Sequence, residues 1–208
     1  MPDADNVRYN PDTGLVYVGH GEKTLTVFDA KTYEVKATVK LPGQPEGFQL
    51  DPARSRAYVN TVRPSAVAVI DLGKHEMVAK YVPAAASDSY PMALDRETQR
   101  IFVGCRKPAV VLALDATTGK ELWTVEIPAD IDDLFHDAKR KRLYASCGEG
   151  VLAVLEEKGG RFEVVERVPT AKLARTCLFD PESGRLFLGV PRQAGNPGPE
   201  IRVYQARP

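Results

Sequence analysis

The stretch "LDRETQRIFVG", residues 94–104, joins a polar turn to a short apolar strand, and the chain repeats this combination four more times. The other copies are "YNPDTGLVYVG" (9–19), "LDPARSRAYVN" (50–60), "HDAKRKRLYAS" (136–146) and "FDPESGRLFLG" (179–189). Aligned on their second residue (Asn10, Asp51, Asp95, Asp137 and Asp180), the copies are 41, 44, 42 and 43 residues apart. A period of this size without a helical pattern indicates a repeated supersecondary unit, most often the blade of a β-propeller.

Each repeat contains four strand-like runs. In the third repeat they are "PMAL" (91–94), "RIFVG" (100–104), "AVVLALDA" (109–116) and "ELWTVEI" (121–127). Val, Ile, Tyr and Phe dominate such runs and Gly, Pro, Asp and Asn separate them, which is typical of strands joined by turns. We therefore predict an all-β fold, in which residues 1–208 form a single propeller of about five four-stranded antiparallel blades. The predicted blades are 6–43, 46–86, 90–129, 132–171 and 175–208, and the last is incomplete, with three strands.

The acidic residue that recurs at the first turn of the repeats has a structural interpretation. Its carboxylate is expected to accept a backbone N–H bond from two residues further on. Asp29, Asp71 and Asp115 are expected to do the same at the next hairpin. A residue that recurs at the same place in every blade supports the scaffold, so we expect function where the blades differ.

The charge of the chain is balanced, with 28 Lys and Arg residues against 28 Asp and Glu residues. A protein of zero net charge has no overall field that attracts nucleic acid or an anionic membrane. No apolar run approaches the roughly 18 residues of a membrane span, and the first ten residues lack the features of a signal peptide. From the residues alone we predict a cytoplasmic protein without a membrane span.

The strand motifs carry a resemblance to a known family. With "RIFVG" (100–104) and "RAYVN" (56–60) followed by runs such as "VLALDATTGK" (111–120), the chain resembles the YVTN-type, YncE-like β-propeller proteins from about Val7 to its C-terminus. The stretch "PMALDRETQRIFVGCRKPA" (91–109) is similar to one bacterial branch of that family. The resemblance implies a propeller that is mostly seven-bladed, an export signal in many members, and single-stranded DNA binding in some relatives, but no assigned reaction for most members.

The number of repeats departs from the family's pattern, and this leaves three interpretations open. The chain is a fragment of a longer propeller, a five-bladed ring with one short blade, or a subunit that forms a homodimer through its unfinished fifth blade. The third interpretation follows because an unpaired strand edge is a template for pairing with another chain. If the chain is a fragment of an exported family member, its location is periplasmic or extracellular.

The blades differ five and four residues before each aligned turn, where the chain enters the innermost strand. Side chains at these positions are expected to surround the mouth of the central channel and to form a ligand-binding site. Converging carboxylates suit Ca²⁺, Mg²⁺ or a cationic ligand, so Glu46, Asp132 and Asp133 are candidate metal ligands. The alternative is that these are solvated loop carboxylates. The complete set of predicted ligand-binding residues is Asp5, Asn6, Glu46, Tyr90, Asp132, Asp133 and Arg175.

A second candidate surface lies in the loops farther from the axis. Basic residues in these loops are candidates for following a phosphate backbone, with Tyr90 as a surface on which a base stacks. The alternative is an ordinary charged surface. The basic residues are Arg63, Arg106, Lys107 and Arg192.

Signatures of catalysis are few. The chain has no GxSxG, HExxH, GxGxxG or P-loop motif. His136 falls in a column that is apolar in the other blades and is expected to be a packed core residue. Cys105, Cys147 and Cys177 have no CxxC spacing and are expected to be small buried residues. We therefore predict a non-catalytic binding or scaffold protein of unassigned ligand and without a cofactor. A metal-assisted, lactonase-like hydrolase and a single-stranded nucleic-acid binder are the alternatives.

Overall fold

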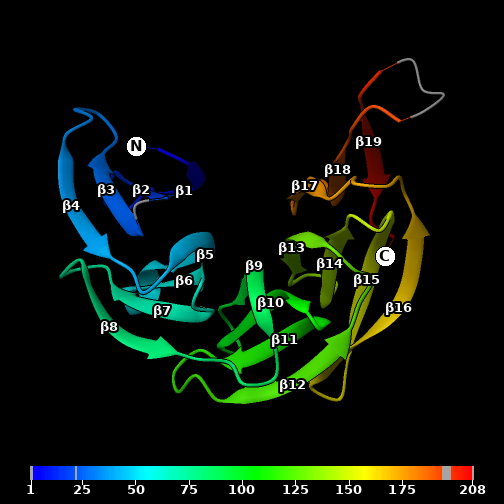
Figure 1. Cartoon of the computed structure of the whole chain (residues 1–208), viewed down its shortest axis with the longest axis horizontal. Coiled ribbons are helices and arrows are strands. Elements are labelled where there is room, and N and C mark those ends of the chain that lie inside the picture. Colours follow the sequence, from blue (N-terminus) through cyan, green and yellow to red (C-terminus); the bar gives the residue numbers. More distant parts are fainter. Residues whose placement is uncertain (1, 22, 194–197, 208) are drawn as a thin grey trace.

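The computed structural model describes residues 2–21, 23–193 and 198–207, and within them the chain forms five antiparallel sheets around one axis (Figure 1). The first sheet contains β1 (Ala4–Asn10), β2 (Leu15–His20), β3 (Thr24–Asp29) and β4 (Val35–Lys40). The second contains β5 (Gln44–Asp51), β6 (Arg56–Val62), β7 (Ala66–Asp71) and β8 (Glu76–Tyr81), and the third β9 (Ser87–Asp95), β10 (Arg100–Lys107), β11 (Ala109–Asp115) and β12 (Glu121–Glu126). The fourth contains β13 (Ile131–Asp137), β14 (Arg142–Cys147), β15 (Val151–Lys158) and β16 (Arg161–Pro169), and the fifth β17 (Thr176–Asp180), β18 (Arg185–Val190) and β19 (Glu200–Gln205).

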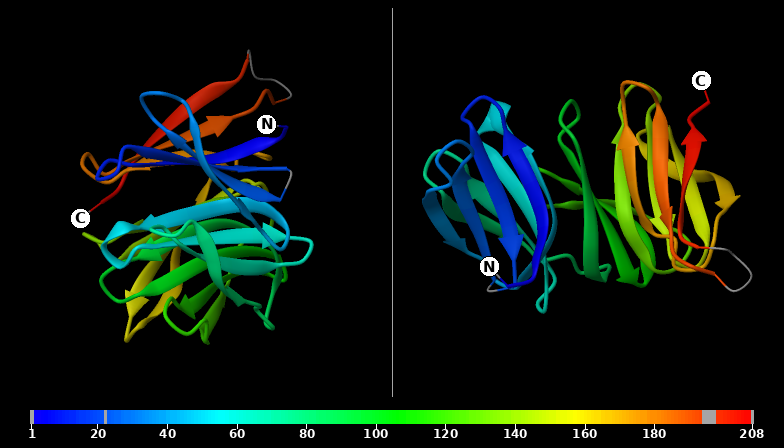
Figure 2. Two further views of the ribbon diagram at one scale, coloured as in Figure 1. Left: turned by 90° about the vertical axis from the view of Figure 1, so that its left-hand side faces the viewer. Right: turned by 90° about the horizontal axis from the view of Figure 1, so that it is seen from above.

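The strands of each sheet are ordered from the axis outward. β1, β5, β9, β13 and β17 are innermost, and each of the first four contacts the innermost strand of the next sheet. Seen from above, successive sheets stand face to face as blades (Figure 2). The predicted all-β propeller, with three strands in the last described blade, is therefore confirmed. Of the predicted range 175–208, residues 194–197 and 208 lie outside the described residues.

The aromatic residue of the second strand fills the space between a blade and the next one. Tyr17, Tyr58, Phe102 and Tyr144 are each at least 95% buried, and each belongs to an apolar cluster that also contains residues of the following blade. Aromatic side chains bury more apolar area than most others, so each contributes several kcal/mol, about 25 cal/mol per Å², to the packing between blades. The recurring strand motif is therefore the core of the fold.

The turn acids behave largely as predicted. Asp95 Oδ1 accepts the N–H groups of Glu97 (3.1 Å) and Thr98 (3.2 Å), and Asp29, Asp71 and Asp115 accept backbone N–H groups at the next hairpin. Asp137 departs slightly from the pattern, because its Oδ1 accepts the N–H of Arg140, three residues further on (3.1 Å).

For Asp51 the prediction is wrong. This residue is followed by a 3₁₀ turn (Pro52–Arg54) that closes through a bond from the Ser55 N–H to the Pro52 carbonyl, and its side chain makes no capping bond. Its Oδ2 instead accepts long bonds from Arg54 (3.5 Å) and Gln99 (3.4 Å).

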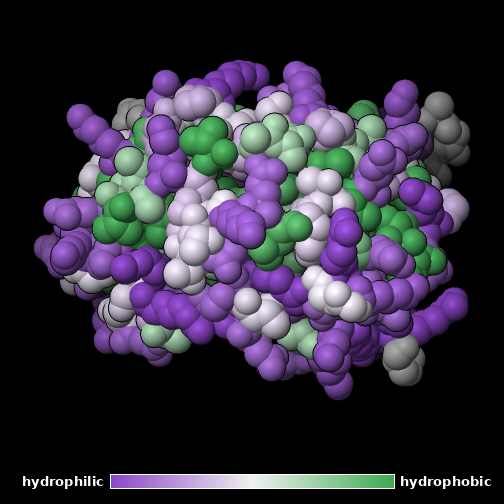
Figure 3. Space-filling model, turned by 90° about the horizontal axis from the view of Figure 1, so that it is seen from below, coloured by the Kyte–Doolittle hydropathy of each residue, from purple (hydrophilic) through white to green (hydrophobic). Residues whose placement is uncertain are grey.

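The outer surface is mainly polar. Around β8 and β12 hydrophilic side chains separate small apolar areas (Figure 3). At the last blade, a groove of about 400 Å³ lies between β19 and the fourth sheet, and its lining includes Val165, Val168 and Tyr204. The homodimer through this blade stays a prediction. None of the described residues belongs to a helix long and apolar enough to cross a membrane.

Gly47 lies where the innermost strands β5 and β9 approach each other closely. A Cβ atom at Gly47 would lie 2.8 Å from the Tyr90 carbonyl oxygen and 2.9 Å from the Met92 nitrogen, both backbone atoms of β9. We expect Gly47→Ala to lower the free energy of unfolding by about 1–3 kcal/mol, the usual cost of overpacking, in denaturant titrations. The control is Gly73→Ala, where the nearest atom to a new Cβ is Asp71 Oδ1 at 3.5 Å. Equal stability of the two variants would contradict the prediction.

Candidate functional site

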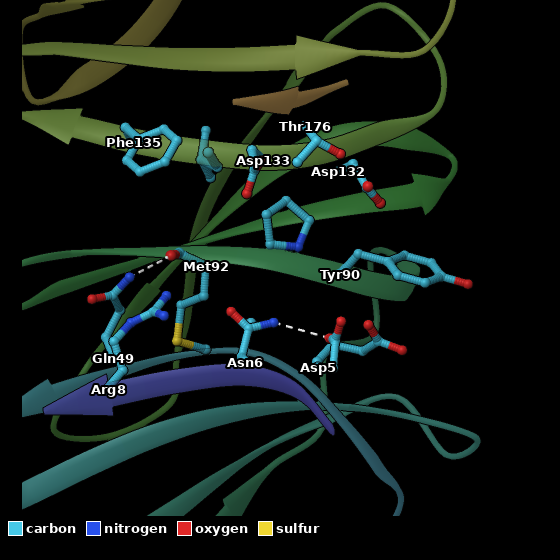
Figure 4. A pocket seen from close by; sticks show the side chains of 14 residues that line it. Asp5, Asn6, Arg8, Gln49, Tyr90, Met92, Asp132, Asp133, Phe135 and Thr176 are labelled. Carbon is cyan, nitrogen blue, oxygen red and sulfur yellow. Dashed lines mark hydrogen bonds between the residues drawn. The ribbon is translucent and has the colours of Figure 1, made fainter. Parts of the chain in front are cut away.

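A cavity of about 270 Å³ lies on the axis and is lined by the innermost strands of all five blades (Figure 4). We call it the axial pocket. Six of the seven residues predicted at the channel mouth line it, and the seventh, Arg175, pairs with Asp132 at its edge. Their role in ligand binding stays a prediction. The lining residues are Asp5, Asn6 and Arg8; Glu46, Gly47 and Gln49; Tyr90, Pro91 and Met92; Asp132, Asp133, Leu134 and Phe135; and Thr176.

Irregular strand pairing directs these side chains to the axis. In the first four sheets the register between the innermost strand and its neighbour shifts at the pocket. In the fourth sheet the shift falls between Ile131 and Asp133. Successive side chains of a regular strand point to opposite faces, whereas a bulge changes their direction. Asp132 and Asp133 can therefore both line the pocket although they are adjacent in the sequence.

Burial shifts the titration of the pocket carboxyls. Glu46 has its pKa raised to about 7, first because burial disfavours the charged form and next because of the neighbouring Asp5 carboxyl. Asp133 also has its pKa raised to about 7 by burial, although the Cys177 N–H donates to its Oδ2 at 2.7 Å and opposes the shift. The charge of the pocket therefore changes near neutral pH.

Asp132 belongs to a cluster of ion pairs at the mouth of the pocket. Its Oδ1 lies 2.6 Å from Arg106 Nη2, and its Oδ2 lies 3.4 Å from Arg175 Nε. Both arginines also contact Asp130, at 3.3 Å and 2.5 Å respectively. The Arg106 guanidinium lies 3.9 Å from the centre of the Tyr90 ring, a cation–π contact. Two arginines thus face two carboxylates here.

The predicted basic surface is partly neutralised by these contacts. Arg106 belongs to the ion-pair cluster, and Lys107 Nζ lies 2.8 Å from Asp88 Oδ2. Arg63 and Arg192 are exposed. Nucleic-acid binding stays a prediction.

Sequence reasoning missed Asp130 and Arg8. Arg8 lines the pocket, donates to the Val7 carbonyl at 2.8 Å and lies over the Phe48 ring at 5.3 Å. Burial lowers its pKa, while Asp133 acts in the opposite direction. No described carboxylate lies within 4 Å of it. A signal was present, because the equivalent positions of the other blades hold Gln49, Ala93, Phe135 and Leu178, so the blades differ here too. Asp130 precedes β13 and carried no such repeat signal.

The candidate metal ligands do not form a cluster. Among the described residues, no group of three or more His, Cys, Asp or Glu side chains is arranged to hold a metal ion. Glu46, Asp132 and Asp133 line one pocket, but Asp132 is engaged with two arginines. A divalent cation at this site stays a prediction.

The remaining candidate groups lie within the blades, and two of them are only partly buried. The His136 ring lies 5.5 Å from the Phe102 ring and burial lowers its pKa, but the residue is half-buried rather than part of the closed core. Cys105 and Cys147 are buried as predicted, whereas Cys177 is only partly buried.

Glu46 provides a pH-dependent test. Because its folded-state pKa of about 7 exceeds its ordinary value of 4.5, the stability it contributes is complete below about pH 4.5 and is lost as the pH rises through 7. Glu46→Gln should therefore raise Tm relative to the unchanged protein at about pH 8 and much less at about pH 5. A difference of a few degrees is expected, since Tm shifts by roughly 2–4 °C per kcal/mol in chains of this size.

The control for this test is Asp115→Asn. Hydrogen bonds from the N–H and hydroxyl of Thr118 lower the pKa of Asp115, so its contribution is present above its ordinary value of 3.8. Asp115→Asn should lower Tm by a similar amount at both pH values. If Glu46→Gln also has the same effect at both, the Glu46 carboxyl titrates normally in the folded protein.

Comparisons with known proteins support the fold. No family model matches the chain. In sequence, the chain is 21% identical over 187 residues to "Uncharacterized protein YncE" of Salmonella typhimurium, covering 88% of this chain and 52% of that protein. The chain thus spans about half the length of this curated relative. In structure, it is similar to a chain of Kuenenia stuttgartiensis hydrazine synthase, with a TM-score of 0.85 and 14% identity over all of this chain and 64% of the other. At this identity, the likeness to hydrazine synthase shows the fold alone.

Proposed function

From the premise that the chain is a YncE-like β-propeller, we propose that it is a non-catalytic binding protein whose axial pocket takes a small polar ligand. The proposal rests on one observation: five blades of similar structure bring chemically different side chains to one pocket. The strands and turns repeat, but at the pocket each blade supplies different groups. Concave sites with a few convergent polar groups are the usual form of small-molecule sites.

The lining favours binding over catalysis. The described lining residues include no Ser, Cys, His or Lys, so they provide no Ser–His or Cys–His pair for nucleophilic catalysis. The rival function, metal-assisted hydrolysis, would need the pocket carboxyls to share a metal ion. Asp132 would then have to leave Arg106 and Arg175. Binding needs no such rearrangement.

A ligand screen tests the proposal. Small charged and neutral compounds are screened by thermal shift, and the hits are measured by calorimetry. We expect hits whose affinity falls at least tenfold in Glu46→Ala, because a charge-assisted hydrogen bond contributes about 1.5–3 kcal/mol. The matched control is Glu34→Ala, at an exposed carboxyl beyond β3. A hit that binds Glu46→Ala and the unchanged protein equally would place binding outside the axial pocket.

Two further measurements address the alternatives. Titration with Ca²⁺ and Mg²⁺ is expected to give no heat that depends on Glu46, and such heat would favour the metal-assisted function. Native mass spectrometry of the same sample reports whether the chain pairs with a second copy, as predicted from its three-stranded blade.

A further inference from the structure

The axial pocket contains charges that the protein pairs itself and charges that it does not. Arg106 and Arg175 face Asp130 and Asp132 with nitrogen–oxygen distances of 2.5–3.4 Å. This cluster needs no ligand to balance it. The charged side chains outside this cluster are the ones available to pair with a ligand.

The first unbalanced charge is the Arg8 guanidinium. It donates to the Val7 carbonyl and lies over the face of the Phe48 ring; Asp133 attracts it electrostatically, but no described carboxylate comes within 4 Å of it. In Figure 4 its side chain lies beside Gln49 at one end of the pocket. A partly buried cation without a carboxylate at hydrogen-bonding distance is costly, so an anion supplied here would be stabilised.

The second unbalanced group is the pair of carboxyls Asp5 and Glu46. The neighbouring Asp5 carboxyl adds to the rise in the pKa of Glu46, and neither carboxyl lies within 4 Å of a described Lys, Arg or His nitrogen; Asp5 Oδ2 accepts the Asn6 amide at 2.9 Å. Two adjacent carboxyls repel one another when both are charged, and a cation between them removes that repulsion. An ammonium group has three donors and no acceptor, which suits this acidic end.

The two unbalanced groups lie at different ends of the pocket. Arg8 and Asp5 are three residues apart on β1, which corresponds to about 10 Å in a regular strand and somewhat less across the bulge. Figure 4 shows Asp5 and Tyr90 at one end and Arg8 at the other. Figure 4 shows the apolar side chain of Met92 between these ends, and Pro91 also lines the pocket.

We propose that the ligand of the axial pocket is a zwitterion, with a carboxylate that binds Arg8 and an ammonium group that binds Asp5 and Glu46. This inference rests on the proposed binding function. Guanidinium and carboxylate form paired hydrogen bonds in one plane, and the ammonium group donates to the two acidic side chains. A ligand with only a positive charge would leave Arg8 unbalanced, and one with only a negative charge would leave the acidic end unbalanced.

The test uses ω-amino acids of increasing length, from glycine through β-alanine and γ-aminobutyrate to ε-aminocaproate, with alkylamines and alkanoates of the same lengths. Affinity is measured by calorimetry on the full chain. We expect the longer amino acids to bind best, because the two charged ends are far apart. Each of these longer amino acids should bind at least tenfold more tightly than the amine and the alkanoate of the same length.

Arg8→Gln gives the decisive signature. It should reduce the affinity of the amino acid to that of the matched amine, while the amine binds as before or more tightly because a repelling cation has been removed. Arg8→Lys, which keeps the charge but loses the paired hydrogen bonds, should be intermediate. Arg192→Gln, at an exposed residue, serves as the control. Circular dichroism and Tm establish that each variant is folded.

The contrary outcomes separate this inference from the proposed function. If amines bind as tightly as amino acids and Arg8→Gln changes neither, the pocket takes cations only; the zwitterion inference is overturned and the binding function stands. If alkanoates bind as tightly as amino acids, the inference is overturned in the same way. If no member of the three series binds, the inference also fails. The binding function is then decided by the Glu46-dependent hits of the screen alone.

Discussion

Each sheet of this protein can bury both of its faces only by standing between two other sheets. This constraint determines the fold, because successive residues on both faces of the second and third strands are buried in the middle sheets, as in β10 and β11. Tyr17, Tyr58, Phe102 and Tyr144 meet it by packing on the following blade, whereas Phe187, in the last blade, is only partly buried. Blades that stack in this way bring their innermost strands together, and the axial pocket is the place where they converge.

Ion pairs between blades strengthen the same arrangement. Arg100 Nη2 lies 3.0 Å from Asp95 in its own blade, and its Nη1 lies 2.7 Å from Glu157 in the next. The guanidinium also lies over the rings of Phe102 and Phe162. A largely buried arginine with two carboxylate partners and two aromatic neighbours links the third and fourth blades by charge as well as by apolar contact.

The fold could be predicted from the sequence because its information is local and repeated. A polar turn residue and an aromatic strand recur five times with a period near 42 residues. A chance match at one repeat therefore has little effect, because the other repeats give the same assignment independently. Asp51 shows the limit of this reasoning. Its sequence fits the turn pattern, yet a 3₁₀ turn replaces the expected side-chain bond. A turn can be closed by a side-chain hydrogen bond or by a backbone hydrogen bond, and the residue types do not indicate which of the two forms.

The candidate site was only partly predictable, for a different physical reason. Repeat phase identified which residues enter the innermost strands, but not the register shifts that turn adjacent residues such as Asp132 and Asp133 toward one cavity. Nor could it show which charges neutralise one another. Arg106 was assigned to an outer basic surface, yet it lies 2.6 Å from a carboxylate 26 residues away.

What the pocket can bind depends more on which charged side chains pair with one another than on the number of acidic and basic residues that line it. From composition the ring of predicted residues is acidic, and that alone would favour a metal ion or a simple cation. The structure adds that Arg106 and Arg175 balance Asp130 and Asp132. Arg8, whose equivalents in the other blades are uncharged, then becomes the positive end of a pocket that still has a negative end. A site built from repeats can become dipolar in this way when a single blade departs from the pattern, since the other blades continue to hold the strands in place.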